Sequence, residues 1–318
     1  CGVDALGKAL VGCEYTAESI DRLCGALRSE HCRLTTLKLT RCQMRVEEAA
    51  KLAAAIKACS VTGPLVQTLV LEGSALPVPQ LLGIRELSQG LHKRLSTECS
   101  KLHTSEVTLI ANLLSENSHL EVLDFNSTSL GSGLTRISHA IAQRKMPLTT
   151  LHLAENGLSV PLAIELVQAL REGAPVLTEL DLSGNPLCGV EEGGRDEYTV
   201  AFVETLCGYM VDGGCGLLTL SLVEVALCGL ARDGNGSYQA QAIALLTECL
   251  SSPAGSPAGT VPLLRSLNIS GCRVREDDAL QMGKGLVRNR NLEKLVLDKT
   301  SLMVQQLARG ERLSLNAV

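Results

Sequence analysis

The side chains of this chain that could do chemistry are its thiols, imidazoles and carboxylates. The 318 residues include 13 cysteines, six histidines and 34 acidic residues. A nucleophile, metal ligand or general base would need them at characteristic spacings, such as G-x-S-x-G, H-E-x-x-H or C-x-x-C, and none of these motifs occurs. Phosphate-binding glycine motifs are missing as well. The sequence therefore predicts a protein that is not an enzyme and that holds no metal or cofactor.

A second chemistry open to these residues is recognition of another protein's surface. Carboxylates and one imidazole recur at positions expected on one face of short strands, namely Glu72, Glu98, Asp124, His152, Glu179 and Asp181. A weakly acidic row of this kind would attract a protein partner with a basic surface. The alternative interpretation is that these are ordinary solvated strand residues, because charges at the rim of an interface contribute little.

A short repeated pattern would place these side chains. Its clearest copy is Leu177-x-x-Leu180-x-Leu182-x-x-Asn185-x-Leu187. Because strand side chains alternate between faces, the leucines of x-Leu-x-Leu-x point inward and their neighbours point outward. The position of Asn185, here called the marker position, recurs ten times, and six of the nine spacings are 26–29 residues. The ten markers are Cys13, Cys42, Ser74, Ser100, Thr128, Asn156, Asn185, Val225, Cys272 and Thr300.

The marker side chain is expected to turn into the core and to satisfy backbone groups that the bend leaves unpaired. Asn, Ser, Thr and Cys suit that role and valine does not, so the sequence predicts a local irregularity at Val225. Between the strands, apolar residues recur at i, i+3, i+4 and i+7, as in Ala163, Leu166, Val167 and Leu170. Each repeat is therefore predicted to contain a strand, a turn and a full helix.

A repeat near 28–29 residues with these leucines and a whole helix resembles the ribonuclease-inhibitor-like class of leucine-rich repeats, over nearly all of the chain. The resemblance implies an α/β solenoid of about ten repeats, a horseshoe with parallel strands on its concave side and helices on its convex side. It also implies a protein–protein interaction module, or scaffold, that binds a protein partner through the concave face and edge loops. Two alternative functions, of other classes, are a regulator of a small GTPase, like the Ran GTPase-activating protein, which has this repeat type, and a substrate-receptor arm of a ubiquitin ligase.

Three insertions interrupt the repeat, at 188–199, 228–241 and 251–262. The first two follow the marker position in neighbouring repeats, so they should lie side by side on one edge. They carry half of the four tyrosines, and their candidate partner-binding residues are Arg195, Tyr198, Arg232 and Tyr238. The alternative is tolerated surface insertion, which is the favoured interpretation for the Pro/Gly/Ser/Ala-rich segment 251–262.

Composition excludes several classes of partner. A net charge of −5 has the wrong sign for a nucleic-acid binder, and two Phe, four Tyr and no Trp leave little for base stacking. No apolar run is long enough to span a membrane, and no small-molecule substrate is expected. Many cysteines at repeat-core positions favour a reduced, cytoplasmic protein, with paired disulfides as the alternative and association with the cytoskeleton left open.

The stacking of each repeat on its neighbours predicts that residues 1–318 form a single leucine-rich-repeat domain. The chain begins at Cys1 inside a degenerate repeat and ends at Val318 without a clear polar cap. Because the ends of a solenoid need caps, we expect the chain to be a fragment of a longer protein.

Overall fold

A computed structural model describes most of the chain. The described residues are 10–11, 17–29, 32, 34–40, 45–62, 68–70, 94–97, 102, 104–116, 119–143, 145–190, 197–212, 214–251, 262–287 and 289–297. They belong to two compact units, Cys1–Leu151 and His152–Val318. The expectation of one continuous domain stays a prediction.

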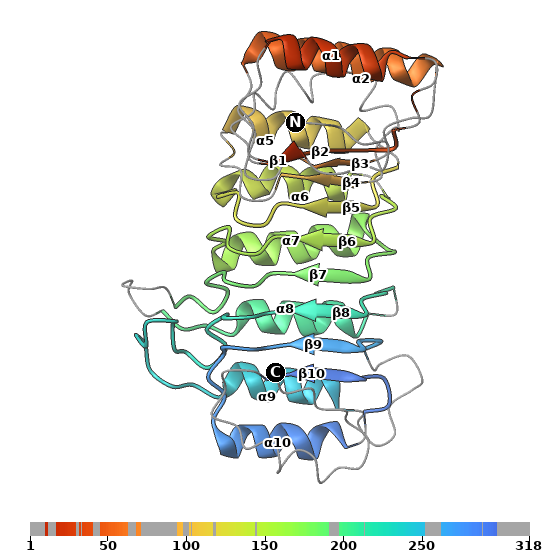
Figure 1. The fold of residues 1–318 in the computed structure, drawn as a ribbon. Helices are drawn as coiled ribbons and strands as arrows, with labels where there is room; N and C mark the ends of the chain where they lie inside the picture. Colours follow the sequence, from red (N-terminus) through yellow and green to blue (C-terminus); the bar gives the residue numbers. More distant parts are fainter. Residues whose placement is uncertain are drawn as a thin grey trace. The chain divides into compact units, whose positions relative to one another are not determined.

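The first unit alternates strands and helices along the chain (Figure 1). Its strands pair in parallel and in sequence order, with Leu37, Leu69, Leu95 and Leu123 in register. Its helices pack in neighbouring pairs, α1 on α2 and α5 on α6. The strands are β1 (Leu10–Val11), β2 (Thr36–Thr40), β3 (Thr68–Val70), β4 (Arg94–Ser96) and β5 (Val122–Asp124). The helices are α1 (Ala17–Leu27), α2 (Val46–Thr62), α5 (Thr104–Glu116), η1 (Gly131–Gly133) and α6 (Leu134–Ala142).

The second unit repeats this order, and β6 (Thr150–His152) spans the boundary between the units. Its strands pair in parallel with Leu180, Leu220, Leu267 and Leu295 in register, and its helices pack in chain order. In Figure 1, α7 and α8 lie on one side of these strands. The strands are β7 (Glu179–Asp181), β8 (Thr219–Ser221), β9 (Ser266–Asn268) and β10 (Lys294–Val296). The helices are α7 (Val160–Gly173), α8 (Ala201–Met210), α9 (Gln241–Leu250) and α10 (Glu276–Leu286).

The core forms as the leucine pattern predicts. Leu180 and Leu182 are fully buried, and so is Leu166 on the helix that precedes them. Burying one such side chain stabilises the fold by roughly 1.5–3 kcal/mol. Parallel strands joined by packed helices, with the leucines inside, are the architecture of an α/β leucine-rich-repeat solenoid, and the predicted fold class is confirmed.

Asn185 at the marker position turns into the core and satisfies backbone groups, as the sequence predicts. Asn185 is buried, and its amide nitrogen donates to the carbonyl oxygens of Leu153 and Leu182, each at 2.9 Å. Its carbonyl oxygen accepts from the backbone N–H groups of Asn156 (3.0 Å) and Leu158 (3.1 Å). This one side chain therefore joins two successive repeats.

The irregularity predicted at Val225 is wrong. The residue before it, Glu224, has the left-handed φ of 56° that Glu155 shows one residue before the Asn156 marker, at 54°. Val225 is fully buried, and its backbone N–H donates to the Leu222 carbonyl within the same turn. In the preceding repeat, the Leu187 N–H donates to the Asn185 backbone carbonyl at 2.8 Å and the Leu182 carbonyl accepts from the Asn185 amide, so these two groups do not need a polar side chain at Val225.

Candidate partner-binding surface

The strand residues that flank the buried leucines in the second unit form a half-exposed polar surface, here called the open face. Strands β6 to β9 show the same alternation, with a buried leucine between partly exposed neighbours. This is the surface on which the acidic row was predicted. Its residues are His152, Glu179, Asp181, Thr219, Ser221, Ser266, Asn268, Lys294 and Val296.

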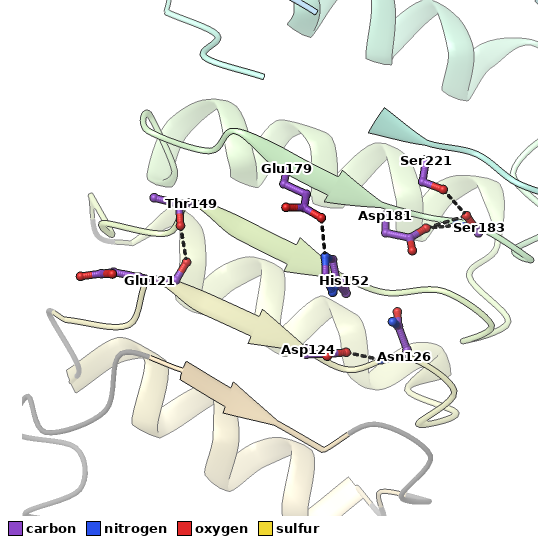
Figure 2. Close-up of polar contacts among 9 residues, drawn as sticks. All are labelled: Glu121, Asp124, Asn126, Thr149, His152, Glu179, Asp181, Ser183 and Ser221. Atoms are coloured by element: carbon purple, nitrogen blue, oxygen red, sulfur yellow. Dashed lines mark hydrogen bonds and ion pairs between the residues drawn. The ribbon is translucent and has the colours of Figure 1, made fainter. Parts of the chain in front are cut away.

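Hydrogen bonds hold several of these side chains in place (Figure 2). Asp181 Oδ1 accepts from the backbone N–H of Ser183 at 3.0 Å and from its hydroxyl at 2.6 Å. Ser183 Oγ also lies 2.8 Å from Ser221 Oγ on the next strand and accepts from the Val223 N–H at 3.1 Å. The polar groups of two adjacent repeats are thus joined in one chain of hydrogen bonds.

The same arrangement recurs two repeats further along. Asn268 Oδ1 accepts from the backbone N–H and the hydroxyl of Ser270, at 3.1 and 2.7 Å. An Asp or Asn followed two residues later by Ser forms this local turn, because the short side-chain oxygen reaches the second N–H along the chain. The open face therefore consists of side chains whose rotamers are set by their neighbours.

His152 and Glu179 are the second polar contact on the open face. His152 Nε2 lies 3.0 Å from Glu179 Oε1, and the two side chains are 22% and 46% exposed. Figure 2 shows them reaching toward each other from β6 and β7. The structure thus brings together three of the predicted residues, His152, Glu179 and Asp181, within neighbouring strands of one unit.

The prediction for Asp124 is wrong. This residue was predicted to face a partner, yet only 4% of it is exposed. Its Oδ1 faces the backbone N–H of Asn126 at 3.4 Å, in the position that Asp181 and Asn268 occupy in their repeats. Since the carboxylate is covered, it serves the local turn and is not available to a partner. Three other candidates, Glu72, Glu98 and Arg195, lie outside the described residues.

The first two insertions begin in the same way. Each starts with a buried cysteine followed by a glycine of positive φ, 77° at Gly189 and 70° at Gly229. The carbonyl of Cys188 accepts from the Thr199 N–H at 3.0 Å, and that of Cys228 from the Gln239 N–H at 2.8 Å. Both loops therefore close at equivalent points.

The sequence contains a signal for this equivalence that the repeat analysis missed. Leu-Cys-Gly is followed in both insertions by eight residues and a tyrosine, Leu187 to Tyr198 and Leu227 to Tyr238. Each tyrosine hydroxyl joins the next repeat. Tyr198 donates to the Leu227 carbonyl at 3.0 Å and accepts from the Ala242 N–H at 3.2 Å, near the start of α9. Burial raises the pKa of Tyr198 to about 12.

Tyr238 repeats this contact one repeat later. Its hydroxyl donates to Asp278 and accepts from the Arg275 N–H at 3.1 Å, at the start of α10. The first N–H groups of a helix have no partner within the helix, so each tyrosine satisfies one of them. The Arg275 guanidinium also stacks over the Tyr238 ring, 3.7 Å from its centroid.

The predicted neighbourhood of the two insertions is confirmed within the second unit. Val190 of the first insertion packs with Ala226 and Ala231 of the next repeat, and Tyr198 covers this cluster. The 228–241 loop projects at the left of Figure 1. Of the third insertion, 251–262, the structure describes the two end residues.

Two arginines lie in or beside the 228–241 loop, Arg232 within it and Arg273 in the next repeat. Arg232, which is 67% exposed, forms an ion pair of 3.3 Å with Glu224. Its carbonyl accepts from the Arg273 guanidinium at 2.7 Å. Of the three described insertion residues that were predicted to bind a partner, Arg232 presents its side chain most fully, while the hydroxyls of Tyr198 and Tyr238 are used inside the protein. Partner binding by these residues stays a prediction.

Tyr198→Phe and Tyr238→Phe are each expected to lower the free energy of unfolding by about 1–2 kcal/mol, because a helix N–H and a second group lose their partner. Chemical denaturation measures this. Tyr209→Phe is the control, because the hydroxyl of buried Tyr209 bonds the weakly polar thiol of Cys215. If the three variants were equally stable, the two tyrosines would not join repeats as described.

The described residues also bear on two other classes of site, metal centres and membrane-spanning helices. Among the described residues, no cluster of three or more His, Cys, Asp or Glu side chains is arranged to hold a metal ion. In the same part of the chain, no helix combines the length and the apolar character needed to cross a membrane.

Comparison with known proteins finds sequence similarity to Ribonuclease inhibitor and to a NACHT, LRR and PYD domains-containing protein. No protein-family model matches the chain. It is 25% identical over 297 residues to Ribonuclease inhibitor of Mus musculus, covering 88% of this chain and 61% of that protein. It is 28% identical over 225 residues to NACHT, LRR and PYD domains-containing protein 5 of Bos taurus, covering 69% of this chain and 19% of that protein. The chain thus spans less than two thirds of the length of both.

Among solved structures, it is similar to the leucine-rich-repeat-containing protein LegL7 from Legionella pneumophila. The TM-score is 0.47 at 16% identity, with 86% of this chain and 79% of that chain covered.

Proposed function

We propose that this chain, a leucine-rich-repeat protein of the ribonuclease-inhibitor-like class, is a protein-binding scaffold whose open face and 228–241 loop recognise a protein partner with a basic surface. One relative, which matches 88% of the chain, bears the name Ribonuclease inhibitor. We extend that kind of role, binding without catalysis, to this chain. The proposal includes no cofactor and a reducing, cytoplasmic setting, since the thiols of Cys188, Cys215, Cys228 and Cys272 are unpaired and buried.

One observation carries the proposal, the chain of hydrogen bonds from Asp181 through Ser183 to Ser221. Side chains that are already ordered lose little conformational entropy when a partner binds, so more of the contact energy is available for affinity. The carboxylates beside them, Glu179 and Asp181, are half-exposed and retain their attraction for cations. An ordered, weakly acidic surface suits recognition of a basic protein.

The same hydrogen bonds support binding as the role of this face, because they occupy its serine and histidine side chains. Ser183 Oγ is engaged with the carboxylate of Asp181, with Ser221 and with a backbone N–H. His152, the imidazole on this face, is directed at Glu179. The Ser183 hydroxyl donates to a carboxylate and accepts from an N–H, so its hydrogen-bonding capacity is used within the protein, which supports a structural role for this side chain.

The proposal is tested with the double variant Glu179→Gln/Asp181→Asn. Both substitutions remove a charge and keep the oxygen that accepts from Ser183 or faces His152, so the open face keeps its shape. With an immobilised basic ribonuclease as the first probe, we expect the variant to bind roughly 3- to 10-fold more weakly at low salt, measured by surface plasmon resonance. The difference should shrink as salt rises, because exposed charges are screened.

The matched control is Glu204→Gln/Glu248→Gln, which makes the same change of net charge on the exposed positions of α8 and α9. It should bind the probe like the original protein. Equal losses in both double variants would show that net charge alone drives binding, and absence of binding to basic proteins altogether would overturn the proposed partner chemistry.

A further inference from the structure

Cys207 and Cys249 lie on adjacent helices of the second unit, α8 and α9, which pack against each other. The helical spacing of Val203, Leu206 and Cys207, and of Ala242, Leu246 and Cys249, predicts that both cysteines are small core residues on inward helix faces. The structure instead leaves both partly exposed at the interface between the helices. Cys188, Cys215, Cys228 and Cys272 of the same unit are buried. The two thiols therefore differ from these neighbours in being accessible.

The contacts between the two cysteines are reciprocal. Cys249 Sγ donates to the Cys207 carbonyl at 3.8 Å, and Cys207 Sγ donates to the Leu245 carbonyl at 3.8 Å on α9. Each thiol also lies close enough to the other to shift its pKa. Each sulfur is thus held against the opposite helix, and the pair is joined across residues that are 42 apart in the sequence.

This contact also makes the two thiols unequal. The hydrogen bond from Cys207 lowers the pKa of Cys249, against the opposing effects of burial and of Glu248. The same hydrogen bond, together with burial, raises the pKa of Cys207. Burial raises the pKa of Cys188, of Cys215 and of Cys228. Because a thiolate is the reactive form of cysteine, the lowered pKa of Cys249 favours Cys249 as the attacking thiol and Cys207 as its partner.

We propose that Cys207 and Cys249 are a dithiol modification site at which a peroxide forms a disulfide between α8 and α9. The Cys249 thiolate attacks one peroxide oxygen, the O–O bond breaks, and the products are a sulfenic acid on Cys249 and hydroxide. The Cys207 sulfur then attacks the sulfenic sulfur, gives up its proton, and the S–S bond forms as hydroxide leaves. Overall, two thiols and one hydrogen peroxide become one disulfide and two waters.

The effect of this disulfide depends on which repeats the two helices belong to. α8 follows β7 and α9 follows β8 in the strand–turn–helix repeat, so the new bond would tie together the two repeats that carry Asp181 and Ser221 on the open face. A cross-link that closes a long loop restricts the unfolded chain and stabilises the folded one. Oxidation would thus stiffen this part of the second unit. The disulfide itself does not depend on the proposed function.

The test is peptide mapping of the full chain after treatment with hydrogen peroxide and alkylation of the remaining thiols. Trypsin separates the two cysteines, because Cys249 is the cysteine of peptide 233–265 and Cys207 lies in peptide 196–232 with Cys215 and Cys228. We expect a disulfide between these peptides. It should be lost in Cys207→Ser and in Cys249→Ser. It should persist in the matched control Cys215→Ser, which removes a buried thiol from the same peptide.

A second measurement, trapping of the sulfenic acid, keeps the proposal testable if a variant folds poorly. Serine at position 207 can still donate a hydrogen bond to Cys249, so Cys207→Ser should stop the reaction at the sulfenic acid, which dimedone traps on peptide 233–265. A chain that yields no cross-linked peptide at peroxide levels that oxidise its other accessible thiols would overturn the proposal. Persistence of the cross-link in Cys207→Ser would overturn the pairing, and labelling of Cys207 rather than Cys249 would overturn the order of attack.

Discussion

Asn185→Ala is expected to lower the free energy of unfolding by about 3–5 kcal/mol. The side chain is 2% exposed and bonds backbone groups of two successive repeats. Its removal leaves the N–H groups of Asn156 and Leu158, and the carbonyls of Leu153 and Leu182, without this partner in the core. Each buried group that loses its hydrogen bond costs roughly 1–3 kcal/mol, less whatever local relaxation recovers.

Two further variants show whether the loss comes from the hydrogen bonds. Asn185→Asp keeps an acceptor for the N–H groups but turns a second oxygen toward carbonyl oxygens, so it should be about as damaging as alanine. Gln168→Ala, an exposed position on α7, should change stability by less than about 0.5 kcal/mol. Urea denaturation followed by circular dichroism gives all three values. An Asn185→Ala variant as stable as Gln168→Ala would mean that the marker side chain does not hold the repeats together.

Gly229→Ala is expected to cost about 3 kcal/mol or more, because two effects combine. The φ of 70° is unfavourable for any residue with a Cβ, at roughly 1–2 kcal/mol. A Cβ at this position would also collide with the Ser237 carbonyl oxygen, which lies across the base of the 228–241 loop. The loop would have to open, and with it the Cys228–Gln239 backbone hydrogen bond.

Gly157→Ala separates the two effects. Its φ of 64° is similar, but a Cβ there would meet no atom within 4 Å. It should therefore cost about 1 kcal/mol, the backbone penalty alone. Thermal unfolding of the two variants measures the difference, and limited proteolysis should show faster cleavage near residues 228–241 in Gly229→Ala. Equal stability of the two variants would show that the base of the loop is not as tightly closed as the structure has it.

Local periodicity determined the elements of this protein. The helix predicted from Ala163, Leu166, Val167 and Leu170 is α7, and all four side chains are buried. The leucine spacing also placed the strands, since Leu180 pairs in register with Leu220 despite the 40 residues between their repeats' markers. These features could be read from the chain because burial of an apolar stripe depends on the residues of one repeat and its period.

The tertiary structure decided which polar atoms meet between repeats. The sequence could not show that Asp124 is covered, that the tyrosines of the insertions bond the start of the next helix, or that Val225 is accommodated by its own turn. It also could not pair Cys207 with Cys249. The tyrosine and cysteine contacts join residues about 30 to 45 positions apart, and a shift of one ångström between neighbouring repeats would change them. Hydrogen bonds depend on such distances and angles, whereas burial of leucine does not, and so the pattern of residues specified the scaffold while packing specified its surface.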